Sequence, residues 1–215
     1  MSREFITEMR RSLEHLNREI IDHPLILDAR SKRLPLDKVK VLLENQAYIV
    51  HHDARSLSMM LARTTRSDEA DYLARLVQVD LSALEALKNI CALLYIDCER
   101  WEDLRIVPES VSYAHFLAFL SNFANTGEQI FALLVNLPVW SEACSRLGAA
   151  LREKYGITET RFFDGFANIP TWVEERGVEL IGRYLQTSRQ RMRLFGRLIQ
   201  AYEKSFWDGV YFYRT

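Results

Sequence analysis

The chain has 215 residues, of which 48% are hydrophobic, and 28 Lys and Arg residues nearly balance 29 Asp and Glu residues for a net charge of -1. This length and apolar content predict one domain, residues 1–215, with a substantial core. The balanced charge, without a basic block, argues against nucleic acid as a partner. The N-terminal stretch "MSREFITEMRR" is charged throughout, so we expect neither a signal peptide nor a membrane span, and a cytoplasmic location.

Long segments with helical periodicity predict an all-α chain, because no segment alternates like a strand before a tight Asn-Gly turn. His23-Pro24 is expected to end the first helix, and Pro138 predicts a kink or break in the fifth. Long helices joined by short turns favour a bundle, with ligand sites between facing helices. We predict helices near 3–21, 36–64, 68–95, 110–124, 127–154, 158–167, 171–187 and 190–211.

Three cysteines, Cys91, Cys98 and Cys144, form no CxxC pair and no even-numbered set. This pattern favours reduced thiols over disulfides or a zinc site. Free cysteine is among the most buried residue types, so we expect each to be a small core residue.

The second predicted helix places two polar residues, Gln46 and Asp53, on an otherwise apolar stripe. The stripe consists of Leu36, Val39, Leu43, Gln46, Val50, Asp53, Leu57 and Met60. Unpaired burial would cost a few kcal/mol for each polar group. These side chains should therefore either join a hydrogen-bonded core network, lie at a partly exposed edge, or face a polar ligand.

The last predicted helix repeats this pattern around Glu203, in the segment "LIQAYEKSFWDGVYFYRT". Its apolar stripe consists of Phe195, Ile199, Phe206 and Val210, with Glu203 in the middle. Surrounding a carboxyl with Phe206, Trp207 and nearby tyrosines disfavours its charged form, which is the usual way to make a general acid. The alternative is a buried glutamate that pairs with an arginine from another helix.

In the fourth predicted helix, Tyr113 heads an apolar face, where it either serves a site or bonds to a backbone carbonyl as a core tyrosine. His51 and His52 are adjacent, so their side chains point about 100° apart and cannot chelate as an i, i+4 pair would. No histidine follows His115 in the sequence, although di-iron bundles need Glu-x-x-His sets from several helices. We therefore predict no metal and no other cofactor.

Three segments together resemble the TenA (thiaminase II) family. They are "DHPLILDARSKRLPLDKVKVLLENQAYIVHHDA", "SYAHFLAFLSNFANTGEQIFALL" and "QAYEKSFWDGVY", and the resemblance follows nearly the whole chain in order. It implies an all-helical fold of the haem-oxygenase type without haem, shared with PqqC-type enzymes and with di-iron oxidases. It also implies a homo-oligomer, either a dimer or a tetramer.

The resemblance implies two retained catalytic residues. The family's catalytic glutamate falls on Glu203, and its active-site tyrosine before the central helices falls on Tyr113. The YE-then-FW pattern of the closing helix adds Tyr202, Phe206 and Trp207 as candidate substrate-binding residues, and Asp53 is a further candidate from the stripe on the second helix.

Other family positions carry different residues. The aspartate that holds an aminopyrimidine falls on Gln46, a tyrosine one turn later falls on Ile49, and the tyrosine of the sixth helix falls on Phe166. The nucleophilic cysteine falls on Asn136, or on Pro138 with another gap placement. Cys144 lies about 12 Å further along the helix axis, so it is a poor substitute. The sequence is therefore similar to the branch of the family that lacks this cysteine.

Three functions are compatible with these residues. The first is a TenA-like hydrolase of thiamin-pyrimidine salvage or of a related small heterocycle, acting through buried Glu203 rather than a cysteine. The second is a non-catalytic protein that binds a small heterocycle. The third is a PqqC-like or di-iron-like oxidative enzyme. Direct DNA binding is disfavoured by the near-zero net charge and the lack of a helix-turn-helix pattern.

Overall fold

The computed structural model describes residues 1–214, and all regular elements within them are helices, which confirms the all-α prediction. None of them combines the length and apolar character that a membrane crossing requires. The α-helices are α1 (Ser2–Ser12), α2 (Glu14–Ile21), α3 (Pro24–Arg30), α4 (Leu36–Arg63), α5 (Ser67–Leu93), α6 (Pro108–Phe123), α7 (Thr126–Tyr155), α8 (Arg161–Ala167), α9 (Thr171–Ile181) and α10 (Leu185–Phe212), and the 3-10 helices are η1 (Trp101–Asp103) and η2 (Gly182–Tyr184).

The N-terminal region differs from the prediction of one helix over 3–21. The chain breaks at Leu13, so that α1 and α2 are separate helices, and a further helix, α3, follows immediately. Pro24 is the first residue of α3, where its missing N–H costs nothing, and the His23 ring accepts a hydrogen bond from the backbone N–H of Leu25 at 3.1 Å. His23-Pro24 therefore ends one helix and also begins the next.

Helix α7 continues without interruption through Pro138, so of the expected kink or break, the break is wrong. Proline cannot donate to the carbonyl four residues earlier, which belongs to Leu134. The Arg10 guanidinium supplies the missing donor, because its Nη2 donates to the Leu134 carbonyl at 2.6 Å. Glu174 holds Arg10 in this position through two hydrogen bonds of 3.0 and 3.1 Å.

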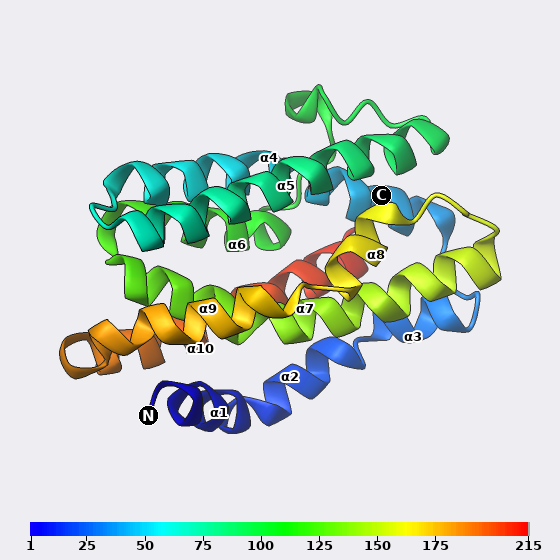
Figure 1. The fold of residues 1–215 in the computed structure, drawn as a ribbon. Helices are drawn as coiled ribbons and strands as arrows, with labels where there is room; N and C mark the ends of the chain where they lie inside the picture. The colour runs from blue at the N-terminus through cyan, green and yellow to red at the C-terminus, as the bar shows by residue number, and fades with distance from the viewer. Residues whose placement is uncertain (215) are drawn as a thin grey trace.

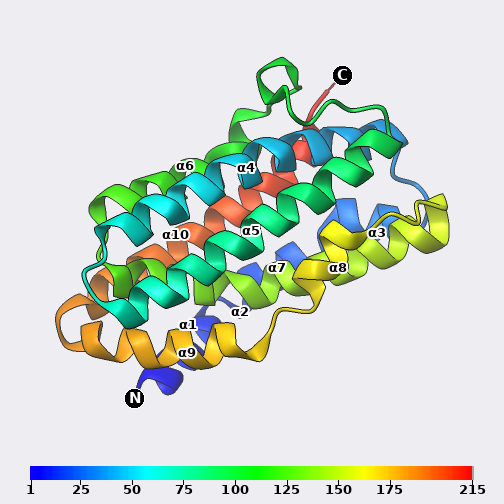
Figure 2. The same ribbon diagram turned by 45° about the horizontal axis from the view of Figure 1, so that its top comes forward.

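The long helices form two sides of a bundle. Helices α4, α5 and α6 lie side by side as one layer (Figure 1), and α10 packs against both α6 and α7. Figure 2 shows α10 between that layer and α7. The short helices α3, α8 and α9 contact α7. This arrangement directs the inward faces of α4, α6, α7 and α10 toward a shared interior.

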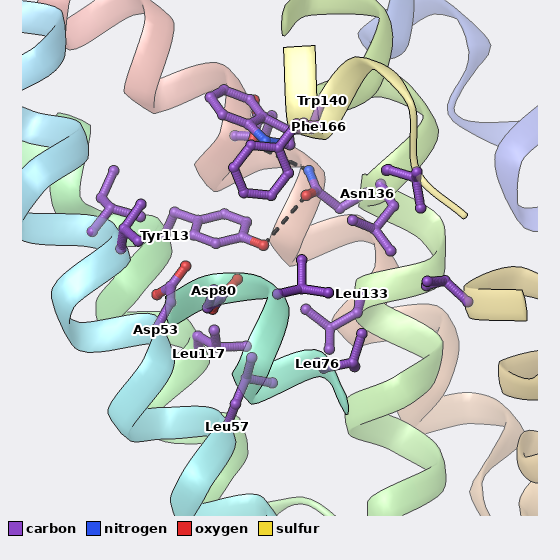
Figure 3. Close-up of a pocket in the computed structure, with 18 of the residues that line it drawn as sticks. Asp53, Leu57, Leu76, Asp80, Tyr113, Leu117, Leu133, Asn136, Trp140 and Phe166 are labelled. Atoms are coloured by element: carbon purple, nitrogen blue, oxygen red, sulfur yellow. Dashed lines mark hydrogen bonds between the residues drawn. The ribbon is translucent and has the colours of Figure 1, made fainter. Parts of the chain in front are cut away.

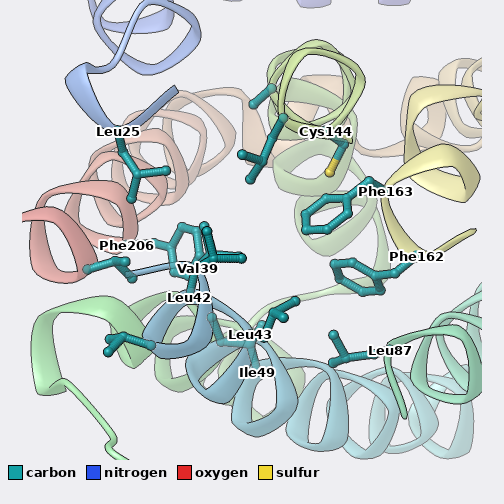
Figure 4. Close-up of a cluster of buried hydrophobic side chains, with 14 of the residues drawn as sticks. Leu25, Val39, Leu42, Leu43, Ile49, Leu87, Cys144, Phe162, Phe163 and Phe206 are labelled. Atoms are coloured by element: carbon teal, nitrogen blue, oxygen red, sulfur yellow. The ribbon is translucent and has the colours of Figure 1, made fainter. Parts of the chain in front are cut away.

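Two clusters of buried side chains form the core. Figure 4 shows part of one, in which Leu42 of α4, Phe163 of α8 and Phe206 of α10 meet. The second cluster includes Phe131. Burying one such leucine or phenylalanine contributes about 1.5–3 kcal/mol. Tyr113 packs against both clusters, which places it at their boundary.

The cysteines are buried as expected, but two of them are not free thiols. Cys91 and Cys98 form a disulfide, whereas Cys144 is free and buried. A turn of backbone after α5 brings Cys98 back to Cys91, which only the three-dimensional path of the chain reveals. The prediction of three reduced thiols is therefore wrong for this pair.

Candidate functional site

A cavity of about 110 Å³ lies at the boundary of the two core clusters, and Figure 3 shows part of its wall. Most of its wall is aliphatic or aromatic, with a few convergent polar groups, as is typical of small-molecule sites. The lining residues are Gln46, Ile49, Val50, Asp53, Leu57, Leu76, Val79, Asp80, Tyr113, Leu117, Leu133, Asn136, Leu137, Trp140, Gly165, Phe166, Ile169, Pro170, Val173, Glu203 and Phe206.

Glu203 is 4% exposed, and both of its carboxyl oxygens accept hydrogen bonds. Trp207, one turn later on α10, donates its Nε1–H to Oε1 at 2.9 Å, and Asn136 of α7 donates from Nδ2 to Oε2 at 3.2 Å. Burial raises the pKa of Glu203 to about 7, while these two donors act in the opposite direction by favouring the ionised form. The partners of Glu203 are therefore neutral donors and not the arginine that the sequence left open.

Asn136 links Glu203 to other helices. Its Nδ2 also donates to Oε1 of Gln200 at 2.9 Å, and the Tyr113 hydroxyl donates to its Oδ1 at 3.3 Å, as the dashed line in Figure 3 marks. Gln200 in turn donates to Oδ1 of Asn17 at 2.6 Å. Tyr113 thus bonds to a side chain facing the cavity and not to a backbone carbonyl. The network fixes the amide orientation of Asn136, and with it the carboxyl plane of Glu203.

Two aspartates form a second acidic group in the cavity wall. Asp53 of α4 is 9% exposed, and its buried Oδ1 has no hydrogen-bond partner in the described part of the chain. Burial raises its pKa well above the ordinary value, and the charges of Asp80 and Glu203 raise it further. Burial also raises the pKa of Asp80, on α5, to about 7. In Figure 3 both carboxyl groups lie beside Tyr113, whose phenol pKa is raised by burial and by these carboxylates.

The structure brings most of the residues singled out from the sequence around this cavity. Those lining it are Glu203, Tyr113, Gln46, Ile49, Asp53, Asn136, Phe166 and Phe206. Trp207 lies behind the wall and contacts Glu203, whereas the Tyr202 ring packs at a tilt against Phe116, with ring centroids 5.1 Å apart. Tyr202 is therefore part of the packing between α6 and α10 and not part of the cavity wall.

Sequence reasoning missed Asp80 and Trp140, which both line the cavity. The signal for Asp80 was present, because it interrupts an apolar stripe on α5 in the same way as Asp53 does on α4. That stripe consists of Leu73, Leu76, Asp80, Leu84 and Leu87. Trp140 had no such signal, since an aromatic residue on an inward helix face is ordinary core composition.

No cysteine lines the cavity among residues 1–214. Cys144 lies in the core cluster, where burial raises the pKa of its thiol well above the usual value and keeps it protonated. The resemblance assigns the nucleophilic cysteine to Asn136 or, with another gap placement, to Pro138, and Asn136 is an amide bonded to Glu203. In the same range of the chain, no three His, Cys, Asp or Glu side chains are grouped so that they could hold a metal ion.

Several solved structures share this architecture. A TenA homologue from Pyrococcus furiosus matches with a TM-score of 0.78 and 19% identity over 96% of this chain and 100% of that chain. A TenA homologue from Pseudomonas syringae pv. tomato matches with a TM-score of 0.81 and 15% identity over 95% and 91%. A candidate TenA-like thiaminase from Sulfolobus solfataricus matches with a TM-score of 0.73 and 15% identity over 96% and 95%. These likenesses confirm the all-α, haem-oxygenase-like fold expected from the sequence.

The sequence itself carries the family assignment. Comparison with curated proteins finds no match. The family model described as TENA/THI-4/PQQC, however, matches residues 10–213, which is nearly the whole chain. The chain therefore belongs to the TENA/THI-4/PQQC family.

Proposed function

We propose that this protein is a TenA-like hydrolase of a small heterocycle, with an aminopyrimidine of thiamin salvage as the first candidate substrate. Glu203 would act as general acid and base. The observation that carries this proposal is the Glu203 carboxyl itself, buried in the cavity wall with its pKa raised to about 7. A group with a pKa near the working pH is present in both protonation states, which suits proton transfer in each direction.

The proposed reaction needs no covalent intermediate on the protein. Ionised Glu203 would take a proton from a water molecule as its oxygen forms a bond to the reacting carbon. The bond from that carbon to the leaving nitrogen would break, and the protonated carboxyl would return the proton to this nitrogen. The buried Cys144 thiol, outside the cavity, is not available for the nucleophilic route.

Polar neighbours would fix the position of the substrate ring relative to the Glu203 carboxyl. Asn136 orients Glu203, and Tyr113 orients Asn136. Gln46 is 4% exposed and lines the cavity, where its amide could bond a ring nitrogen or an exocyclic amino group. Ile49, Phe166 and Phe206 supply apolar wall against the ring faces.

The cavity volume favours a ligand with one ring. At about 110 Å³ it is somewhat smaller than an engineered protein cavity of roughly 150 Å³ that binds benzene. A substituted pyrimidine matches this scale better than a two-ring compound such as thiamin. A cavity of this size supports the salvage of a pyrimidine fragment.

The test is turnover of aminopyrimidine substrates by wild type and by Glu203→Gln, followed by chromatography of the product. We expect turnover by wild type and a loss of at least about 100-fold in kcat for the variant, because general acid–base catalysis typically contributes 10²–10⁴-fold. Glu153→Gln, on the exposed face of α7, is the matched control. Turnover that survives Glu203→Gln, or its absence in wild type, would show that the proposal is wrong.

Asn136 gives specific support to a second function, a non-catalytic binding protein. It stands where the resemblance places the nucleophile, and its amide occupies one oxygen of Glu203. This function predicts tight binding of a heterocycle without product across the substrate panel. The di-iron-like form of the oxidative function receives no support from a ligand set within residues 1–214, whereas the metal-free PqqC-like form requires none.

Other expectations from the sequence remain predictions. We propose one domain over 1–215, because both core clusters pack against Leu16 and Tyr113. A homo-oligomer, dimer or tetramer, is to be tested by light scattering. The Cys91–Cys98 disulfide argues against the expected cytoplasmic location, because cytosolic thiols are kept reduced.

A further inference from the structure

Among residues 1–214, no group donates a hydrogen bond to the buried Oδ1 of Asp53. Its side chain lines the cavity, is 9% exposed, and has a buried Oδ1 without a hydrogen-bond partner. Most buried polar groups in proteins are paired, and an unpaired one costs the full desolvation free energy. The alternative of a satisfied core network, which the sequence left open, does not describe this residue.

A second carboxyl lies next to it. Asp80 faces the same cavity from α5, and its charge adds to the effect of burial in raising the pKa of Asp53. Figure 3 shows the two carboxyl groups together beside Tyr113. Within residues 1–214, neither aspartate takes part in an ion pair, and the cavity wall contains no Lys, Arg or His. The wall therefore contains three carboxyl groups, counting Glu203, and no basic side chain.

We propose that Asp53 and Asp80 form a cation-binding subsite of this cavity, which receives a protonated amino or amidinium group of the ligand. The inference rests on the cavity being the ligand site of the proposed function, and it adds the charge class of that ligand. Glu203 remains the acid at the reacting bond, while the aspartate pair binds the charged end.

A cationic nitrogen group satisfies each requirement of this arrangement. It brings N–H donors to the unpartnered Oδ1 of Asp53, and its charge offsets the repulsion between the two carboxylates. An amidinium is planar and can donate two parallel hydrogen bonds to one carboxylate, which is a strong and directional pairing. A neutral ligand of the same shape would leave the charges uncompensated.

The position of the pair also changes how the ligand lies. The resemblance puts the family's ligand-holding aspartate at Gln46, which has no charge. Asp53 is seven residues further along α4, about 10.5 Å at 1.5 Å per residue. The charged end of the ligand would therefore lie about two helical turns from the position implied by the family pattern, toward α5.

The experiment compares three single-ring probes of nearly identical shape by calorimetric titration at pH 8. Benzamidine is a cation, benzamide is neutral and benzoate is an anion. We expect wild type to bind benzamidine at least about tenfold more tightly than benzamide, and to bind benzoate most weakly. Benzylamine, titrated in parallel, tests the protonated amino group.

Variants assign the effect to the aspartates. Asp53→Asn and Asp80→Asn should each weaken benzamidine binding at least about tenfold while changing benzamide binding less than about twofold. Asp71→Asn, on an exposed position of the same helix as Asp80, is the matched control and should behave as wild type. Thermal melting without probe verifies that each variant folds.

The proposal is wrong if wild type binds neither benzamidine nor benzylamine more tightly than benzamide. It is also wrong if both aspartate variants keep the wild-type preference for the cation. Because the readout is binding, the result is distinguishable from the turnover test. Turnover that depends on Glu203, with no preference for cations, would support the hydrolase proposal and reject the cation-binding subsite. Cation binding that depends on Asp53, without turnover, would support the subsite and reject the hydrolase proposal.

Discussion

Asn136 donates a hydrogen bond of 3.2 Å to Glu203 from a position 67 residues earlier in the chain. The same amide nitrogen bonds Gln200, and its carbonyl oxygen accepts from Tyr113. A neutral amide thus occupies one of the two positions, Asn136 and Pro138, where the family resemblance places a nucleophile. In this protein it acts as a positioning group for the buried acid.

The first prediction concerns Asn136→Ala. Removing the donor to Oε2 disfavours the ionised carboxyl, so the pKa of Glu203 should rise above its wild-type value of about 7. The substitution should also cost about 1–3 kcal/mol of stability, because Gln200 and Tyr113 lose their partner. Carboxyl titration by NMR on labelled glutamate measures the pKa, and Asn89→Ala, at an exposed position of α5, is the control. A pKa that stays or falls would contradict the prediction.

The second prediction is the pH dependence of stability from Glu203. Its pKa is raised from 4.5 to about 7 by folding, so the folded state holds a proton that the unfolded state loses. The stability associated with this proton is full below pH 4.5 and is lost as the pH rises through about 7. Between pH 5.5 and 8.5 the loss should be about 2 kcal/mol.

Urea unfolding of wild type and Glu203→Gln at the two pH values isolates this contribution. Groups distant from Glu203 titrate alike in both proteins, so the difference between the proteins reports Glu203 together with its charge coupling to Asp53. Wild type should lose more stability than the variant at the higher pH. Equal losses would mean that Glu203 titrates near its ordinary pKa.

The third prediction tests the close approach of α10 to α6, which carry Glu203 and Tyr113. A Cβ on Gly209 would lie 3.0 Å from the backbone nitrogen of Ser110 and closer still to its hydroxyl oxygen. Gly209→Ala should therefore force the helices apart and cost about 1–3 kcal/mol. Gly165→Ala is the matched control, because open space surrounds its Cβ, and it should gain about 0.5–1 kcal/mol from helix propensity. Chemical unfolding of both variants decides the result, and equal stabilities would contradict it.

The fourth prediction concerns Cys91 and Cys98. Alkylation of the denatured chain without reductant should label one cysteine, Cys144, and alkylation after reduction should label all three. Reduction should lower stability by about 2.5 kcal/mol, the value that chain entropy gives for so short a loop. Protein purified under oxidising conditions is the relevant sample, and labelling of all three cysteines without reductant would disprove the bond.

Much of the candidate site was predictable from the sequence because helical periodicity is local. The stripes on α4 and α10 directed Gln46, Asp53 and Glu203 inward, and all three line the cavity. The same rule would have found Asp80. Helical periodicity could not exclude Tyr202 from the cavity wall. Whether a residue next to an inward position reaches the cavity depends on the neighbouring helix, and here Phe116 of α6 packs over Tyr202.

Two features were mispredicted because the path of the folded chain decided them and local sequence patterns did not. Pro138 predicted a break because its local hydrogen bond is lost, yet Arg10 compensates the Leu134 carbonyl from α1. Cys91 and Cys98 showed no disulfide spacing because the bond depends on the path of the intervening turn.

The sequence by itself determined the helical class, the family and the inward direction of the acid, because these depend on residue type and on a period of 3.6 positions. Only the tertiary structure decided which polar groups meet. Asn136 reaches Glu203 and Asp53 lies beside Asp80 because of how α4, α5, α7 and α10 pack. Packing depends on the shapes of many side chains at once, so a local sequence pattern cannot predict it.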